Sequence, residues 1–385
     1  MSIAPYAALP RAIRLFPSLS LLRLVLRHGA ACVALGLDVA AIDGGDDLLV
    51  RRWLDDRAGL LPAALADDLE RIDELAHERG ATALQDAARR TGADVRGLGL
   101  DPVEVAVCTF LDHPAVFESA HGRQLVRTLR GTTEFIGRRA GCPLAGVPAA
   151  LNALEATLGH HFDARARSAH CRIIRSRDED RHIFEIAHGA LVRADEALDG
   201  GPLVLRDSAM PVYLAESSLR YRPQRRDVVV YEALAGRLRV RAGDAATLHA
   251  YRTAFGELLF GDAGWFGTEP IVSLEPLIRL GQAVEKPTAG LREVRLVGLV
   301  LRHEAPEGKM ALDSDEIWPY LNAKLLGGLQ DTELLEACFR VYPIGSEKPA
   351  NIKVRAPNRV EYGRMADELF RPFLEARGFL ARAGA

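Results

Sequence analysis

Apolar side chains recur every three or four residues through the first part of the chain, which is the period of a helix that buries one face. Asp46 and Asp101 mark helix starts as N-cap residues, while Gly80 and Gly92 mark helix ends. The chain shows no longer repeat, so we expect one compact helical domain over residues 1–165 rather than a helical solenoid. The predicted helices are 46–56, 62–79, 82–90, 102–111, 123–138 and 148–161.

After residue 165 the pattern shifts to short runs that are rich in β-branched residues. Turns separate these runs in pairs, as in β-hairpins, and a helical stretch that ends at Gly261 follows the second pair. We assign these elements to a mixed α/β domain at residues 166–285. They are strands 171–175 and 182–187, strands 227–231 and 237–241, and a helix over 245–260.

The last segment, residues 286–385, predicts elements in the order β-α-β-β-α. That order suits a small α+β module, or a winged-helix-like unit with residues 344–349 at the tip of the wing. The whole chain is therefore predicted to be an α+β multi-domain protein with an all-helical N-terminal domain. The elements of this segment are strand 294–302, helix 314–324, strands 338–342 and 351–355, and helix 364–377.

Composition places the chain among globular proteins with a large core. Its 385 residues are 48% hydrophobic and 26% charged, which allows two or three domains. The five cysteines are far apart and form no CxxC pair, so we expect reduced thiols, no structural metal and a cytoplasmic location. The most apolar early window, residues 19–42, carries Arg23, Arg27 and Asp38. Charges are costly inside a bilayer, so the window predicts buried helices and no membrane partner.

Asp227 enters the β-branched run of the second hairpin, and the return strand 237–241 leads into a helix. This layout resembles the active-site hairpin of the restriction-endonuclease-like, PD-(D/E)XK nucleases. The order of the predicted elements from residue 148 to residue 302 is also similar to the α-β-β-β-α-β core of that class. In those enzymes a Glu-x-Lys ends the second strand, whereas this strand ends in Arg239-Val240-Arg241-Ala242. The resemblance therefore implies a degenerate nuclease-like domain that has lost its cutting residues.

An active nuclease of this class needs at least two carboxylates around a divalent ion. A second register of the motif would use Asp178 or Asp180 with Glu185, and it lacks the lysine as well. We expect no cofactor, except a divalent metal ion if the chain is an active nuclease. The candidate catalytic carboxylates are Asp227, Asp244 and Glu155.

Two histidines suggest a different hydrolase. Arg27-His28-Gly29 resembles the Arg-His-Gly signature of histidine phosphatases, and the strand-like run before His188-Gly189 resembles their later His-Gly element. By that resemblance His28 would be the nucleophile and His188 its partner at the phosphoryl group. The competing interpretation is that both are ordinary histidines at turns or helix ends.

Arginine-rich segments are the candidates for nucleic-acid binding, because guanidinium groups contact phosphate and an aromatic ring stacks on a base. Residues 219–226 hold four arginines and one tyrosine, and alternation along the strand 237–241 places three more arginines on one face. Lys353, Arg355 and Arg359 form a further basic group. A solvated face or pairing with acids is the competing interpretation. The predicted binding residues are Arg220, Tyr221, Arg222, Arg225, Arg226, Arg237, Arg239 and Arg241.

The formal net charge of −3 argues against polyanion binding by the whole surface, so binding would be local. We expect a non-catalytic, nucleic-acid-associated subunit of a bacterial DNA-processing or phage-defence system. Its partners would be DNA or RNA, and a protein complex held by the N-terminal helical domain. One alternative is an interaction or scaffold protein that binds no nucleic acid. Another is a hydrolase, either a metal-dependent nuclease through Asp227 or a phosphatase through His28 and His188.

Overall fold

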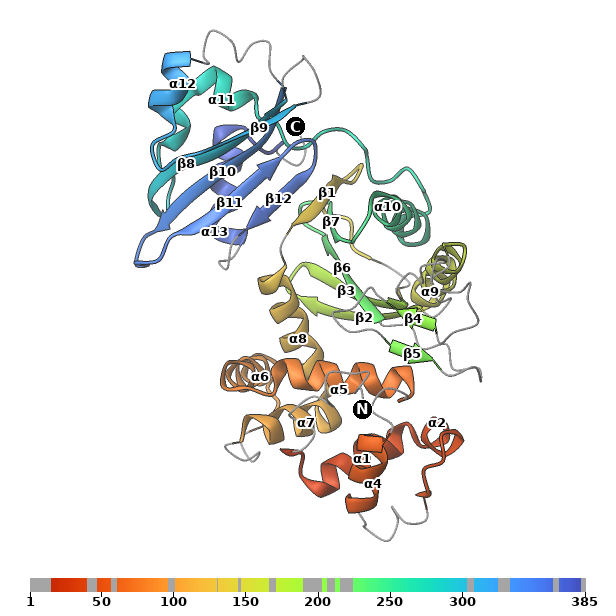
Figure 1. Cartoon of the computed structure of the whole chain (residues 1–385). Coiled ribbons are helices and arrows are strands. Elements are labelled where there is room, and N and C mark those ends of the chain that lie inside the picture. The colour runs from red at the N-terminus through yellow and green to blue at the C-terminus, as the bar shows by residue number, and fades with distance from the viewer. Residues whose placement is uncertain are drawn as a thin grey trace. The chain divides into compact units, whose positions relative to one another are not determined.

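The computed structural model describes most of the chain and shows an α+β protein, which confirms the predicted class (Figure 1). The described residues are 15–39, 47–56, 61–95, 101–129, 131–144, 147–165, 171–189, 203–205, 212–214, 224–302, 308–324, 333–362 and 367–381. They divide into two compact units. Unit 1 comprises Met1–Gln124, Gly159–Asp178 and Ala187–Arg226, and unit 2 comprises Leu125–Leu158, Glu179–Ile186 and Asp227–Ala385. The bounds of these units differ from those of the three predicted domains.

Unit 1 is built mainly from helices around one apolar core, which includes Leu24, Trp53, Leu69 and Phe117. Its helices form where the sequence supplies end signals. Asp101 caps the helix that begins at Pro102 by accepting a hydrogen bond from the Val103 N–H. The helices are α1 (Ser18–Arg27), α2 (Gly29–Ala34), α4 (Asp47–Asp56), α5 (Ala63–Leu75), α6 (Glu78–Thr91), α7 (Pro102–Asp112) and α8 (Pro114–Thr128), the last of which ends beyond the unit boundary.

Two glycines show where local helix signals work and where they fail. Gly92 ends α6 with a left-handed φ of 72°, as predicted. Gly80 was expected to end a helix but lies inside α6, so this prediction is wrong. A Cβ atom at Gly80 would come within 2.2 Å of the Leu75 carbonyl oxygen. This glycine is therefore explained by the close approach of the end of α5.

Unit 1 also holds β2 (Cys171–Asp178) and a two-stranded sheet of β4 (Leu203–Leu205) and β5 (Val212–Leu214). The next strand in the chain, β3 (Arg181–Gly189), begins after a two-residue turn at which Glu179 has a φ of 56°. The two strands predicted at 171–175 and 182–187 are thus present, with longer bounds.

In unit 2 the strands of the main sheet follow the order β3-β6-β7-β1-β12-β11-β10-β8-β9. All pairs with a described register in this sheet are antiparallel. The remaining strands are β1 (Thr132–Ile136), β6 (Gln224–Glu232), β7 (Arg237–Arg241), β8 (Leu291–Arg302), β9 (Lys309–Asp313), β10 (Glu333–Pro343), β11 (Ala350–Arg355) and β12 (Arg359–Tyr362).

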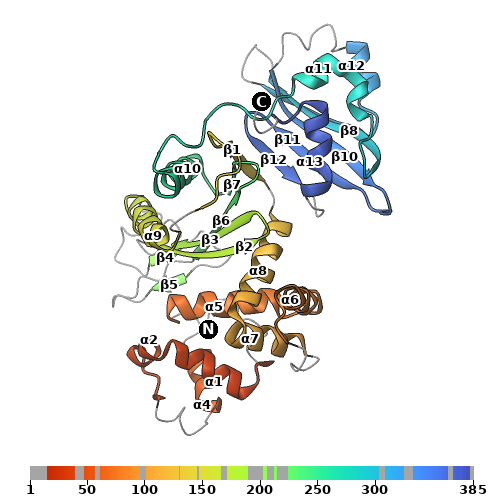
Figure 2. The same ribbon diagram turned by 180° about the vertical axis from the view of Figure 1, so that it is seen from behind.

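The helices of unit 2 are α9 (Val147–Asp163, which continues past the unit boundary), α10 (Ala245–Phe260), α11 (Glu275–Leu280), the 3₁₀ helix η3 (Gly281–Glu285), α12 (Trp318–Lys324) and α13 (Asp367–Arg377). Figure 2 shows α13 in front of β10 and β11, and Figure 1 shows it behind the same strands, so it covers one face. Phe373 of α13 and the following Phe379 each pack edge-on against Phe339 of β10. These rings form the centre of the core under this part of the sheet.

The predicted helix 123–138 is wrong in its second half. The helix α8 ends at Thr128, Gly131 takes a left-handed φ of 66°, and Thr132–Ile136 form the strand β1. The strand is stabilised by long-range pairing, since β1 lies between β7 and β12. The C-terminal segment also holds two strands, β9 and β12, that the predicted β-α-β-β-α order lacked. Among the described residues no helix is long and apolar enough to cross a membrane.

Candidate functional site

Asp227, the first candidate metal ligand, lies in β6 with only 8% of its surface exposed. Its Oδ2 accepts a hydrogen bond of 2.9 Å from the Tyr251 hydroxyl. Asp244 acts as the N-cap of α10, because its two oxygens accept hydrogen bonds of 2.9 Å from the backbone N–H and the hydroxyl of Thr247. Glu155 lies half-buried on α9. The three carboxylates therefore lie on three different elements, and those of Asp227 and Asp244 hold structural hydrogen bonds.

Two carboxylates of the second register of the nuclease motif are also held within the fold. Asp178 forms an ion pair with Arg123, and Glu185 is buried in β3. In the part of the chain that the structure describes, no three or more His, Cys, Asp or Glu side chains form a group that could hold a metal ion.

Arg237, Arg239 and Arg241 were predicted to share one strand face and to bind nucleic acid there, but the structure buries the first two. Only 4% and 2% of their surfaces are exposed. Alternation does place them on one face of β7, but that face is covered. Arg239 Nη1 lies 3.3 Å from Glu232 Oε1, and its Nε lies 3.6 Å from Glu134 Oε1. The guanidinium groups therefore neutralise internal carboxylates, and only Arg241 at the end of β7 is exposed.

This charge cluster extends to α13. Arg237 lies 3.6 Å from Glu232 and 3.7 Å from Glu375, while Arg371 Nη2 donates to Glu134 Oε2 at 2.5 Å. Glu134 was not predicted as a partner of these arginines, because it lies in the segment that was predicted as a helix. The cluster joins β1, β6, β7 and α13 within unit 2, which is a structural role. Glu134 and Glu375 are distant from these arginines in the sequence, so no local pattern identified them, whereas Glu232 lies opposite Arg237 in the same hairpin.

Arg226 is also paired. Its guanidinium group lies 2.9 Å from Glu70 and 3.2 Å from Glu74, both on α5 of unit 1. Arg225 lies in β6, where its side chain is not described, and Arg220, Tyr221 and Arg222 lie outside the described residues. In the C-terminal basic group, Lys353 and Arg355 pair with Glu336, and Arg359 pairs with Glu361.

The two phosphatase candidates have different partners. His28 Nε2 lies 2.9 Å from Asp68 Oδ2, while the ring of His188 stacks on Phe162 at 4.0 Å between centroids. Asp68 also pairs with Arg172 at 3.3 Å. A phosphoryl group beside His28 would meet the buried Asp68 carboxylate, and this like charge disfavours the site.

The strand β8 presents a different feature, an edge that is only partly covered. Along one side it pairs with β10 from Leu291 to Arg302. On its other side β9 pairs only with Gly298–Arg302. The first half of β8 therefore has no neighbouring strand on that side among the described strands. An open edge of this kind presents backbone groups to a partner.

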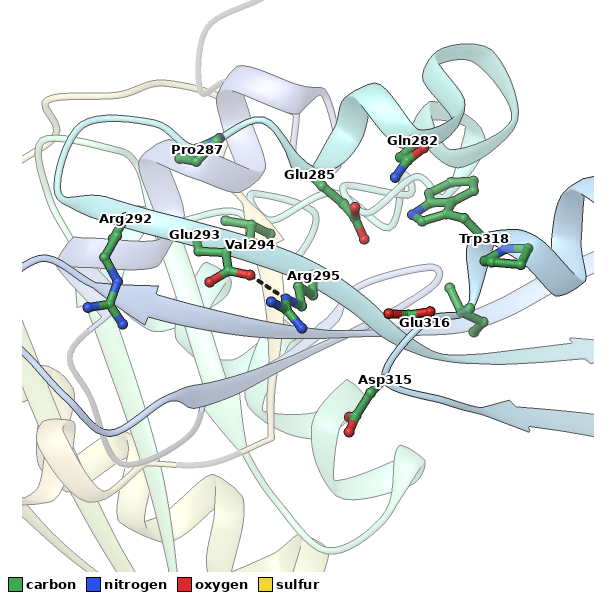
Figure 3. A pocket seen from close by; sticks show the side chains of 12 residues that line it. Gln282, Glu285, Pro287, Arg292, Glu293, Val294, Arg295, Asp315, Glu316 and Trp318 are labelled. Carbon is green, nitrogen blue, oxygen red and sulfur yellow. Dashed lines mark hydrogen bonds and ion pairs between the residues drawn. The ribbon is translucent and has the colours of Figure 1, made fainter.

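A cleft of about 500 Å³ lies beside this half of β8 (Figure 3). Its walls come from η3 and the loop after it, and from the beginning of α12 with the residues before it. Four carboxylates and two guanidinium groups line it, which gives a formal charge of −2. The lining residues are Gln282, Glu285, Pro287, Arg292, Glu293, Val294, Arg295, Asp315, Glu316, Ile317, Trp318 and Pro319.

Several of these charges are already compensated. Arg295 forms an ion pair with Glu293, and Asp315 forms one with Arg340 of β10. Glu285 Oε1 accepts a hydrogen bond of 2.7 Å from the Leu296 N–H. Neither Glu285 nor Glu316 has an ion pair with another described residue, so their negative charge is available in the cleft.

Trp318 supplies an uncompensated donor. Only 6% of its surface is exposed, and its indole Nε1 has no hydrogen-bond partner in the described part of the protein. Figure 3 shows this nitrogen on the side of the ring that is turned toward the cleft. Buried N–H groups nearly always have an acceptor, so the geometry suits a ligand that brings one. The only sequence signal for this site is the acid-rich run Asp313–Glu316 directly before Ile317 and Trp318, and it did not lead to a prediction.

No known protein-family model matches this chain, and no curated protein matches it in sequence.

Proposed function

We propose that the protein is a non-catalytic subunit that binds a partner polypeptide in the cleft beside β8. The observation that supports this most directly is the buried indole N–H of Trp318, which lies in a cleft next to an open strand edge. The carbonyl oxygens of a polypeptide can accept hydrogen bonds both from that indole N–H and from the N–H groups of the strand edge. A rigid small molecule does not supply such a row of acceptors along a strand.

The cleft is better suited to a polypeptide than to nucleic acid. Its formal charge of −2 repels phosphates. Nucleic-acid association stays a prediction, and it loses the support of Arg226, Arg237 and Arg239, whose guanidinium groups are paired with carboxylates. It now depends on Arg241, on Arg225 and on the segment 220–222. Hydrolase activity through Asp227 is not favoured, because Tyr251 donates to the buried carboxylate.

Site-specific photo-cross-linking in the native host tests the proposed function. A photoreactive amino acid is placed at Glu316, which is exposed at the cleft, and separately at Leu234, which is 73% exposed in the turn between β6 and β7. We expect a discrete cross-linked polypeptide from position 316 and none from position 234. Replacing Trp318 with Phe, which keeps an aromatic ring but removes the indole N–H, should reduce the adduct. A protein that gives no adduct at position 316, or equal adducts at both positions, contradicts the proposal.

A further inference from the structure

We infer that the partner binds as an extended strand that adds to the open edge of β8 and places a basic side chain between Glu285 and Glu316. This inference rests on the proposed function and names the chemistry of the partner. It follows from the directions of the backbone groups in β8, the room beside them, and the charge of the cleft.

The backbone directions come from the register. In an antiparallel pair, successive residues of a strand point their N–H and C=O groups alternately toward and away from the neighbour. The N–H of Leu296 donates to Glu285, so residue 296 points away from β10. The pairing is regular from Glu293 to Leu296, so Val294 points its N–H and C=O the same way.

Val294 lines the cleft, and neither of its outward backbone groups has a hydrogen-bond partner among the described residues. An added strand would lie about 4.8 Å from β8 and would form a pair of hydrogen bonds with Val294. At Leu296 the outward N–H is already bound by Glu285, which limits the added strand to a short segment. Strand addition here therefore depends mainly on one residue.

The side chains of the cleft select the partner. Glu285 is half-buried and Glu316 is exposed, and no other described residue forms an ion pair with either of them. A Lys or Arg side chain from the added strand would compensate these charges, whereas an acidic one would be repelled. Trp318 Nε1 would donate to a carbonyl of the same segment. The exposed rings of Pro287 and Pro319 would pack against its uncharged side chains.

The test uses the full-length protein and a fluorescein-labelled, capped hexapeptide of alternating valine and threonine with one central lysine. Fluorescence anisotropy measures binding. We expect a matched peptide with glutamate in place of the lysine to bind at least about tenfold more weakly, the factor that corresponds to about 1.4 kcal/mol. A peptide that is N-methylated on alternate amides should lose binding on the methylation pattern that blocks the amides facing β8.

Two substitutions separate backbone pairing from charge. Val294→Pro removes the outward N–H without removing a bond to β10, since an edge position tolerates proline, and it should abolish binding, while Val294→Thr should not change it. Glu285→Gln keeps the acceptor for Leu296 and removes the charge. It should weaken the lysine peptide but not a matched glutamine peptide. The N-methylated peptide keeps the test valid if Val294→Pro fails to fold, which circular dichroism would show.

The outcomes distinguish the two proposals. If a polypeptide cross-links at position 316 and Val294→Pro leaves the adduct unchanged, the strand-addition inference fails and the proposed function stands. If neither the lysine peptide nor any host polypeptide binds, both fail. Equal affinity for the lysine and glutamate peptides overturns the basic-partner inference alone.

Discussion

Glu134 of β1 and Arg239 of β7 lie directly opposite each other in the sheet, and both are almost completely buried. The Arg239 Nε lies 3.6 Å from Glu134 Oε1, while Glu134 Oε2 accepts a hydrogen bond from Arg371 of α13. Glu134 thus connects the strand β7 with the helix α13. Such a cluster contributes to stability only while every charge has its partner, because an isolated buried charge is costly.

We expect Glu134→Gln to lower the free energy of unfolding by about 3–5 kcal/mol, the typical cost of removing one member of a buried ion pair. Urea denaturation measures the change. The control is Glu333→Gln, which removes a partner of Arg302 in a pair whose side chains are more than half exposed, and it should cost at most about 1 kcal/mol. Similar losses for the two variants would show that the buried cluster does not stabilise unit 2.

Substitutions of the β7 arginines should lower stability by different amounts, according to how deeply each arginine is buried. Arg239→Ala should lower the unfolding free energy by about 3 kcal/mol or more, because Glu134 and Glu232 lose a compensating charge. Arg241→Ala should change it by less than about 0.5 kcal/mol, since Arg241 is exposed. Urea denaturation measures the stability of both variants, and fluorescence anisotropy with labelled single- and double-stranded DNA measures their DNA binding. If folded Arg239→Ala were fully stable and selectively lost DNA binding, our assignment of Arg239 to a structural role would be wrong.

The sequence predicts an element well where neighbouring residues determine its boundaries. The bounds of β7 and of α10 agree with the prediction residue for residue. For α10 the reason is local, because Asp244 caps the start of the helix and Gly261 ends it with a φ of 73°. The strand β1 was mistaken for helix because its conformation depends on pairing with β7 and β12, which are about a hundred residues or more away in the chain. Local propensity carries no information on such partners.

The candidate site shows the same limit. Alternation predicted correctly that Arg237 and Arg239 share a face, but it does not say whether that face is covered. Here Glu134 and α13 cover it. The cleft beside β8 combines η3, β8 and the start of α12, so its shape depends on tertiary packing that no single segment specifies.

Two acids on α5 should make unit 1 sensitive to low pH. Burial acts to raise the pKa of Asp68, but the hydrogen bond with His28 and the charge of Arg172 together hold that pKa below its ordinary value of 3.8. Burial acts on Glu74 in the same direction, and the hydrogen bond with His121 and the charge of Arg226 hold the pKa of Glu74 below 4.5.

A carboxyl group with a lowered pKa in the folded state stabilises the fold above its ordinary pKa, and this stabilisation is lost as the pH falls toward the lowered value. We therefore expect the urea midpoint to be steady near pH 6 and to fall below about pH 4.5. The double variant Asp68→Asn, Glu74→Gln should have a lower midpoint at pH 6 and a shallower fall. A fall of the same steepness in the double variant would assign the acid sensitivity to other groups.

The hydrogen bond between Tyr251 and Asp227 makes a specific prediction about metal binding. Because the carboxylate is buried and accepts the Tyr251 hydroxyl, we expect Mg²⁺ and Mn²⁺ to leave the melting temperature of the protein unchanged, since a bound ion would raise it by mass action. Asp227→Ala should cost about 1–3 kcal/mol by removing a buried acceptor, and Asp227→Asn, which keeps an acceptor oxygen, should cost less. Differential scanning fluorimetry with and without metal, on the wild type and on Asp227→Asn, checks this. A metal-dependent rise in the wild type that disappears in Asp227→Asn would establish Asp227 as a ligand and restore the nuclease interpretation.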